Sequence, residues 1–138
     1  MTAAGEWLID KSALARLHLS PDKAAWTERI GRGLVSICSP TVLEVGFSAR
    51  SVSGWAAAVT DFPVALMPLR YITPGTERRA LEVQGLLAER GQHRAASIPD
   101  LLVAAVAELH GLTILHLDKD FDLICAVTGQ PAERIRAP

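Results

Sequence analysis

Short apolar runs alternate with helical patterns along the whole chain, and this alternation constrains the fold more than any other feature. The clearest runs span 7–9, 34–38 and 113–117, and each has three to five residues. Strands that alternate with helices predict a mostly parallel sheet covered by helices on both faces. We therefore expect an α/β protein with three α/β/α layers and a central sheet of short strands.

The helical segments between these runs are delimited by capping residues and by helix breakers. Pro40 stands at an early helix position, where its missing N–H costs nothing, and Gly91 and Gly111 follow helical patterns as helix ends. The segment 64–69 lies beside Pro63 and includes Pro68, so it predicts a short strand or an edge segment. Helices are predicted at 11–19, 22–31 or 22–33, 39–47, 53–60, 74–90, 97–110 and 121–127, and a last edge strand near 134–136.

Length and composition are consistent with one domain over 1–138. Hydrophobic residues make up 49% of the chain, enough for a core without disulfides, and the two cysteines, Cys38 and Cys125, are expected as small buried residues in a reducing cytoplasm. No segment is long and apolar enough to cross a membrane, and Met1–Gly5 does not begin a secretory signal. We expect a soluble cytoplasmic protein.

Two of the predicted strands end in aspartate. Asp10 follows the run 7–9, and Asp118 follows the run 113–117. Since ligands of parallel sheets bind beyond the carboxyl ends of the strands, chemistry is expected there. Glu44 lies between apolar neighbours inside a predicted helix, and Asp100 lies in the first turn of another. All four acids are expected at one edge of the sheet.

Each acid also has an ordinary structural explanation. Asp10 is a good helix N-cap, Glu44 can form a capping box with Thr41, and Asp100 can face a helix dipole beside Ser97. Together, however, four carboxylates at one edge need a cation to stay ionised. Oxygen ligands favour Mg²⁺ or Mn²⁺, and the histidines show no paired metal spacing. His116, inside an apolar run, is expected in the core.

The segment 118–122, Asp-Lys-Asp-Phe-Asp, allows two other interpretations. An EF-hand calcium loop is excluded, because its sixth position is Leu123 rather than Gly and its twelfth is Gly129 rather than Glu. A haloacid-dehalogenase phosphatase is a weak alternative, because only 16 residues follow Asp122.

Four sequence blocks resemble, in order and spacing, the motifs of the PIN-domain family. They are LIDKSAL at 8–14, PTVLE at 40–44, IPDLLVAA at 98–105 and LHLDKDF at 115–121. The chain looks most like the VapC-type toxins of bacterial toxin–antitoxin pairs, and the resemblance covers essentially its whole length. Lys11 departs from the pattern, because the family commonly has a small or polar residue there.

The resemblance implies a PIN fold, Mg²⁺-dependent endonuclease action on RNA, with Mn²⁺ as a substitute, a homodimer, and inhibition by a VapB-type antitoxin. It implies that Asp10, Glu44, Asp100 and Asp118 form the acidic site, with Asp120 as a fifth metal ligand, and that Ser12 steadies the ligands by hydrogen bonding. The substrate would be tRNA or another structured RNA. The antitoxin would lay a helix over an apolar groove and direct an arginine into the acids; the groove is expected around Leu14, Leu17, Trp26, Trp55 and Phe62.

The charge balance permits RNA binding without establishing it. The chain has 14 Lys and Arg against 15 Asp and Glu, so a metal that holds four acids leaves a mildly basic surface. A solvated helix face is the ordinary alternative for the basic residues after position 77. The candidate phosphate contacts are Arg78, Arg79, Arg90, His93 and Arg94.

Two other function classes remain open at this point. One is a PIN-like module without catalysis that binds proteins. The other is a phosphotransfer protein, which would form a stable acyl phosphate at Asp10 or Asp118.

Overall fold

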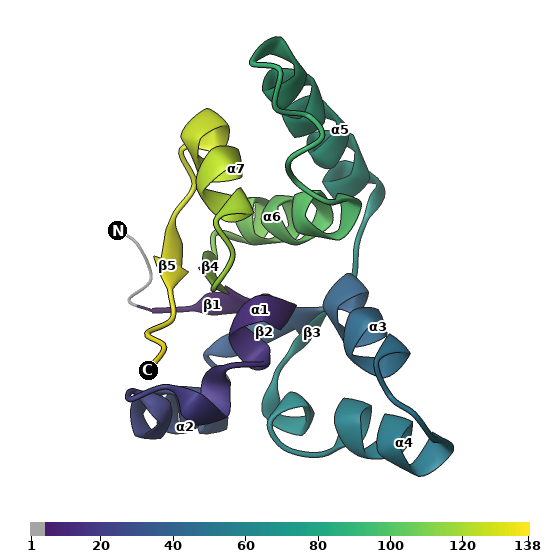
Figure 1. Cartoon of the computed structure of the whole chain (residues 1–138), viewed down its shortest axis with the longest axis vertical. Helices are drawn as coiled ribbons and strands as arrows, with labels where there is room; N and C mark the ends of the chain where they lie inside the picture. Colours follow the sequence, from purple (N-terminus) through teal and green to yellow (C-terminus); the bar gives the residue numbers. More distant parts are fainter. Residues whose placement is uncertain (1–4) are drawn as a thin grey trace.

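The computed structural model describes residues 5–138, so the expectation for Met1–Gly5 lies outside the described residues except at Gly5. Its centre is a parallel five-stranded sheet in the order β3-β2-β1-β4-β5 (Figure 1). The strands are β1 (Trp7–Ile9), β2 (Val35–Cys38), β3 (Leu69–Arg70), β4 (Thr113–His116) and β5 (Ala132–Arg134). The parallel sheet confirms the predicted α/β fold class.

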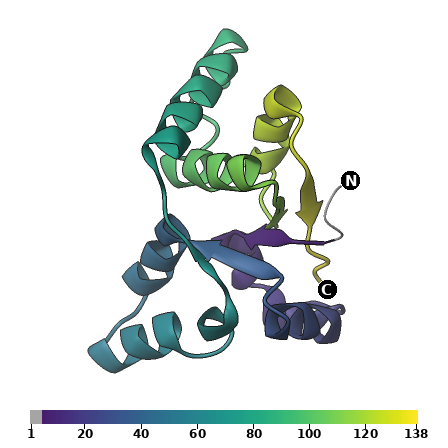
Figure 2. The same cartoon turned by 180° about the vertical axis from the view of Figure 1, so that it is seen from behind.

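Helices cover both faces of this sheet, as Figures 1 and 2 show from opposite sides. One core contains side chains of α5, α6 and α7, and the other contains side chains of α1, η1, α2 and η2. The helical elements are α1 (Lys11–Leu14), η1 (Leu17–Leu19), α2 (Lys23–Gly31), α3 (Ser39–Phe47), α4 (Val52–Thr60), η2 (Val64–Leu66), α5 (Pro74–Glu89), α6 (Ile98–His110) and α7 (Asp120–Thr128).

The side chains of the central strands alternate between the two cores. Leu8 and Ile114 belong to the core beside α6, whereas Ile9 and Leu115 belong to the core beside α2. All four are fully buried. Successive side chains of a strand point to opposite faces, so short strands that are apolar on both faces suit a sheet between two helical layers.

Three local expectations were wrong in detail. The stretch 11–19 is not one helix, because α1 ends at Leu14 and the 3₁₀ helix η1 follows. The stretch 64–69 is mostly the 3₁₀ helix η2; β3 begins only after Pro68, which has no N–H to donate to a ladder. The helix predicted at 53–60, with Ser53 expected as its cap, begins at Val52 instead, and its cap is Ser51, whose Oγ accepts the N–H of Gly54 at 3.0 Å.

The burial of the cysteines and the character of the helices bear on two further expectations. Cys38 is buried as expected, whereas Cys125 is only partly buried. Between residues 5 and 138, no helix combines the length and the apolar character needed to span a bilayer.

Candidate active site

Five carboxylates line one cavity of about 410 Å³ at the carboxyl edge of the sheet. Asp10 directly follows β1, Asp118 lies two residues beyond β4, and Asp120 begins α7. Glu44 comes from α3, and Asp100 comes from the first turn of α6. The structure thus brings together all four acids of the predicted site and the fifth that the resemblance added.

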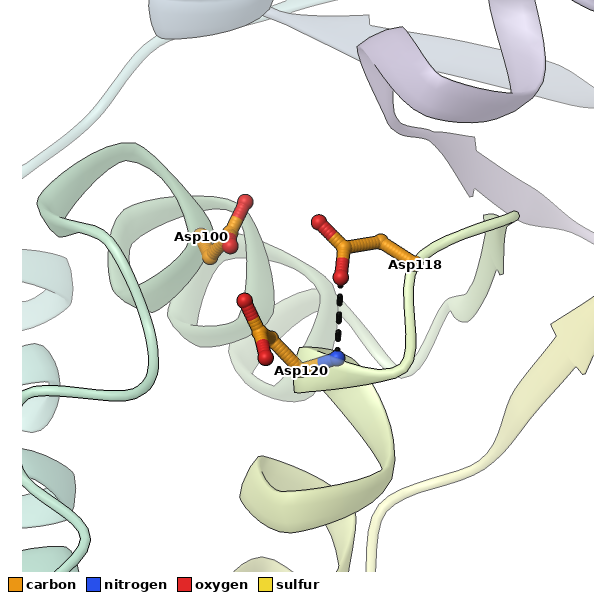
Figure 3. Close-up of side chains that lie close together, drawn as sticks. All are labelled: Asp100, Asp118 and Asp120. Atoms are coloured by element: carbon orange, nitrogen blue, oxygen red, sulfur yellow. Dashed lines mark hydrogen bonds between the residues drawn. The ribbon is translucent and has the colours of Figure 1, made fainter.

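The tightest part of the cavity is a trio of aspartates from two helices and a loop (Figure 3). One carboxylate oxygen each of Asp100, Asp118 and Asp120 lies within 4.8 Å of the other two. The backbone N–H of Asp120 donates to Oδ1 of Asp118 at 2.9 Å. Asp120, which the resemblance added only as a fifth ligand, therefore belongs to the closest group of carboxylates in the cavity. Oxygen-only donors at this spacing fit a hard divalent cation.

Ser12 connects the loop after β1 to the loop after β4. Its backbone N–H and its hydroxyl both donate to Oδ2 of Asp10, at 3.0 and 2.6 Å. Its Oγ also accepts the N–H of Leu117 at 2.9 Å. Asp10 is also the N-cap of α1, so the same carboxylate caps a helix and lines the cavity. One hydroxyl thereby orients a carboxylate and a neighbouring loop, as the resemblance implied for Ser12.

His116 also holds the loop that carries Asp118, through a hydrogen bond. The backbone N–H of Asp118 donates to Nδ1 of His116 at 3.2 Å, and the imidazole lies 5.1 Å from the Phe121 ring. His116 is buried, as predicted, and burial lowers its pKa. The ring is therefore neutral, with its proton on Nε2 and Nδ1 free to accept.

The structural alternative for Glu44 does not occur. Thr41 is fully buried, and its Oγ1 lies 3.4 Å from Sγ of Cys38 instead of capping the helix together with Glu44. Since α3 begins at Ser39, Glu44 lies one turn inside the helix and lines the cavity.

Negative charge is crowded in this cavity. Burial, together with the smaller effects of the charges on Asp10 and Asp118, raises the pKa of Asp100 to about 6. Burial and the charge of Asp10 also raise the pKa of Glu44, while Lys11 partly offsets this. Ionised carboxylates that repel one another gain a favourable partner when a divalent cation binds, so the donor set fits a metal ion.

The pH dependence of stability follows from Asp100. Its pKa is about 6 in the folded protein and 3.8 in an ordinary environment, so the folded state binds this proton more tightly. In EDTA, the contribution of protonated Asp100 to the free energy of unfolding is expected to be full below about pH 4 and lost as the pH rises through 6. Denaturant unfolding at several pH values measures it.

The control is Asp100→Asn, which has no proton to lose at this position. Its unfolding free energy should fall less than that of the unmodified protein over the same pH range. If the free energy of unfolding changed equally with pH in the two proteins, ionisation of Asp100 would have no effect on stability.

The bridging hydroxyl gives a second prediction. Ser12→Ala leaves Oδ2 of Asp10 with one donor fewer and the N–H of Leu117 without an acceptor. We expect the affinity for Mn²⁺ to fall by about 10- to 100-fold, as measured by calorimetry, because outer hydrogen bonds orient metal ligands. The control is Ser53→Ala, on exposed α4. Equal Mn²⁺ affinities for the two variants would contradict the role of the Ser12 hydroxyl in orienting Asp10.

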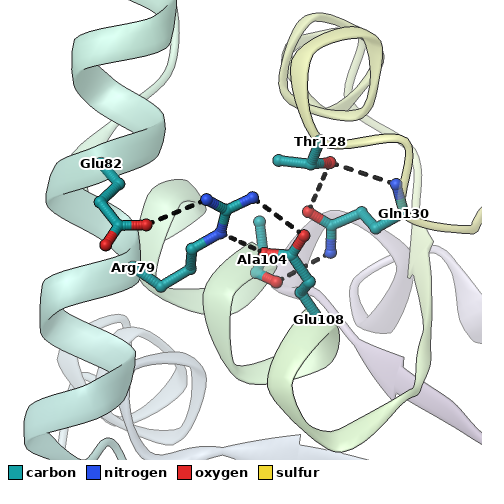
Figure 4. A network of polar contacts seen from close by, with 6 residues as sticks. All are labelled: Arg79, Glu82, Ala104, Glu108, Thr128 and Gln130. Atoms are coloured by element: carbon teal, nitrogen blue, oxygen red, sulfur yellow. Dashed lines mark hydrogen bonds and ion pairs between the residues drawn. The ribbon is translucent and has the colours of Figure 1, made fainter.

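The structure gives Arg79 a role other than the predicted RNA contact (Figure 4). Its guanidinium binds both carboxylate oxygens of Glu108, at 2.6 and 3.1 Å, and Glu82 at 3.1 Å. It thereby joins α5 to α6, and a further contact of the same group to phosphate is unfavourable. The other four candidates are exposed and lie outside the lining of the acidic cavity, so they stay predictions: Arg78, Arg90, His93 and Arg94.

The two cations that do line the cavity are Lys11 and Arg16, which the sequence prediction did not include. With Ser12 and Ala15 they occupy one side of the segment that begins with α1. The four residues lie at i, i+1, i+4 and i+5 counted from Lys11, a spacing that places side chains on one face of a helix. Once Ser12 is placed beside the acids, this spacing predicts that Lys11 and Arg16 also line the cavity.

Comparison with known proteins identifies this combination of fold and acidic cavity as a PIN domain, whose family model matches residues 7–127. Ribonuclease VapC2 of Mycobacterium tuberculosis is 60% identical over 129 residues, which are 94% of this chain and 92% of the relative. Ribonuclease VapC21 of the same species is 43% identical over 134 residues, 96% and 95% of the two chains. The chain belongs to the VapC family of PIN-domain proteins, which confirms the resemblance seen in the four sequence blocks.

Solved structures agree on the fold. The VapBC complex bound to DNA from Salmonella typhimurium has a TM-score of 0.76 at 17% identity, covering 94% of this chain and 98% of that one. VapBC-5 from Mycobacterium tuberculosis has a TM-score of 0.62 at 26% identity, covering 96% and 99%.

Proposed function

We propose that this protein is a Mg²⁺-dependent endoribonuclease, the toxin of a toxin–antitoxin pair, which acts in the cytoplasm as a single domain over 1–138. The observation that carries the proposal is the convergence of five carboxylates on one cavity, three of them within 4.8 Å. Relatives at 60% and 43% identity are named ribonucleases. The substrate is tRNA or another structured RNA, and Mn²⁺ substitutes for Mg²⁺.

The residues divide into those that hold the cation and those that handle the substrate. Asp100, Asp118 and Asp120 hold it, and Asp10, fixed by Ser12, completes the ligand set. Bound Mg²⁺ stabilises charge on the phosphate and lowers the pKa of a water. Glu44 lines the cavity outside the trio and has a raised pKa, so it suits acceptance of the proton from the attacking water. Hydrolysis breaks the P–O3′ bond and leaves a 5′-phosphate and a 3′-hydroxyl.

Analysis of RNA ends tests this proposal. Purified protein with total tRNA and Mg²⁺ is expected to give fragments that carry 5′-phosphates and 3′-hydroxyls. A substrate with a single 2′-deoxy sugar at the cleaved bond should still be cut, because water and not the 2′-hydroxyl attacks. Cyclic 2′,3′-phosphate ends would contradict the mechanism, absence of fragments would favour a binding module, and a covalent phosphate on Asp10 or Asp118 would favour phosphotransfer.

A second cavity, of about 390 Å³, suits the VapB-type antitoxin. It lies on the other side of α1 and η1 from the acidic cavity. The sequence left open which of the five apolar residues belong to the core: Leu14, Leu17 and Phe62 line this cavity, Trp26 is a core residue, and Trp55 lies outside the lining. An apolar groove of this kind accepts the apolar face of a helix. From there an arginine of the antitoxin can reach over α1 into the acidic cavity.

An exposed apolar surface supports the proposed homodimer. On α3, Leu43 is 73% and Phe47 is 90% exposed, and both line one hollow with Pro99. Leu81 of α5 and Ile98 of α6 are each 69% exposed and line another. Exposed apolar side chains of this kind mark contact surfaces between proteins. A second copy of the chain is the occupant that the resemblance implies.

A further inference from the structure

Arg16 is the arginine that lines the acidic cavity. Elsewhere in the described chain four arginines form ion pairs with carboxylates and the others form none; the paired ones are Arg32, Arg79, Arg134 and Arg136. Arg16 lines a cavity with five carboxylates, yet over residues 5–138 it forms neither an ion pair nor a side-chain hydrogen bond. An arginine that served only to neutralise these acids would be expected to pair with one of them. Its donors are instead available to a ligand.

Lys11 lies beside Arg16 on the same wall of the cavity. Its Nζ donates to Oγ of Ser48 at 3.2 Å, and in the part of the chain that the structure describes it forms no ion pair. Ala15, which lies between these two positions in the sequence and also lines the cavity, adds neither charge nor a hydrogen-bonding side chain. A ligand in the cavity therefore meets two cations as well as the aspartate trio.

From this arrangement we propose that Arg16, with Lys11, binds the RNA phosphate next to the bond that is cut. The inference rests on the proposed function and names how that site holds its substrate. A cation held by the aspartates would offset the charge of the reacting phosphate, whereas the adjacent phosphate would keep its charge and need a partner. A guanidinium binds two phosphate oxygens in one plane, and an ammonium adds a second, less directional contact.

The experiment separates RNA binding from cleavage. Arg16→Gln is placed in the Asp100→Asn background, in which cleavage is expected to be about a thousandfold slower, and the dissociation constant of fluorescent total tRNA is measured at several KCl concentrations. We expect it to rise about tenfold and the salt slope to fall by about one, the signature of one lost phosphate contact. Arg16→Lys should recover part of the affinity. In the otherwise unmodified protein, Arg16→Gln should raise KM more than it lowers kcat.

Arg32→Gln is the matched control, because it removes the same charge from an exposed residue that pairs with Glu28 outside the cavity. Unchanged tRNA affinity and salt slope in Arg16→Gln would overturn the inference. A fall in Mn²⁺ affinity with an unchanged salt slope would also overturn it, because Arg16 would then support the metal site. If the unmodified protein cuts no RNA, the proposed function fails first; if it cuts RNA and Arg16→Gln binds normally, only this inference fails.

Discussion

Asp100→Asn is expected to slow RNA cleavage by about a thousandfold while it makes the metal-free protein more stable. Asp100 supplies one of the three close oxygens of the metal site, and loss of several kcal/mol of charge stabilisation corresponds to that factor. The same carboxyl is buried and repelled by Asp10 and Asp118, so a neutral amide relieves a cost. In EDTA we expect Tm to rise by about 4 °C.

Opposite changes in activity and stability distinguish a functional acid from a structural one. Asp122→Asn is the control: this carboxylate lies in the first turn of α7, is exposed, and lies 3.9 Å from Arg134, outside the cavity. It should keep its activity and its Tm. Full activity in Asp100→Asn would remove this residue from the mechanism, and a loss of activity with a lower Tm would indicate a fold defect instead.

Removal of divalent cations is the second change with a large expected effect. EDTA should abolish cleavage, and Mg²⁺ or Mn²⁺ should restore it, because five carboxylates without a cation present only negative charge to an RNA phosphate. Binding should also be visible without substrate. At a cation concentration about 100 times Kd, the folded state gains about 2.7 kcal/mol, which a thermal scan detects.

A variant of the trio provides the control for this measurement. Asp118→Asn should show a much smaller rise in Tm with Mn²⁺ than the unmodified protein. Cleavage that continues in EDTA would point to a nuclease that uses only its own side chains. Equal thermal shifts in both proteins would place the cation elsewhere.

Much of the site could be predicted because its acids follow local patterns. Asp10 and Asp118 stand after apolar runs that can only be strands, and parallel strands place their carboxyl ends at one edge. Asp100 follows a proline at the start of the clearest helix. These acids could be predicted from the periodicity of nearby residues and from the rule that parallel sheets bind ligands beyond the carboxyl ends of their strands.

The remainder depends on contacts between distant segments. Arg79 pairs with Glu108, 29 residues away, and no helical spacing reveals that pair. β3 has only two residues, too few to form an alternating pattern. The predicted helix 11–19 breaks between α1 and η1, which tertiary packing decides.

The position of Asp10 has a practical consequence for anyone who needs a harmless form of this protein. Asp10 caps α1, whose Leu14 lines the apolar groove proposed for the antitoxin. A change at Asp10 therefore disturbs catalysis and inhibitor recognition together. Asp100 lies on α6, outside the lining of that groove, so inactivation there leaves the apolar groove itself unchanged. Production of the assembled pair, or selection of new inhibitors, should start from the Asp100 variant.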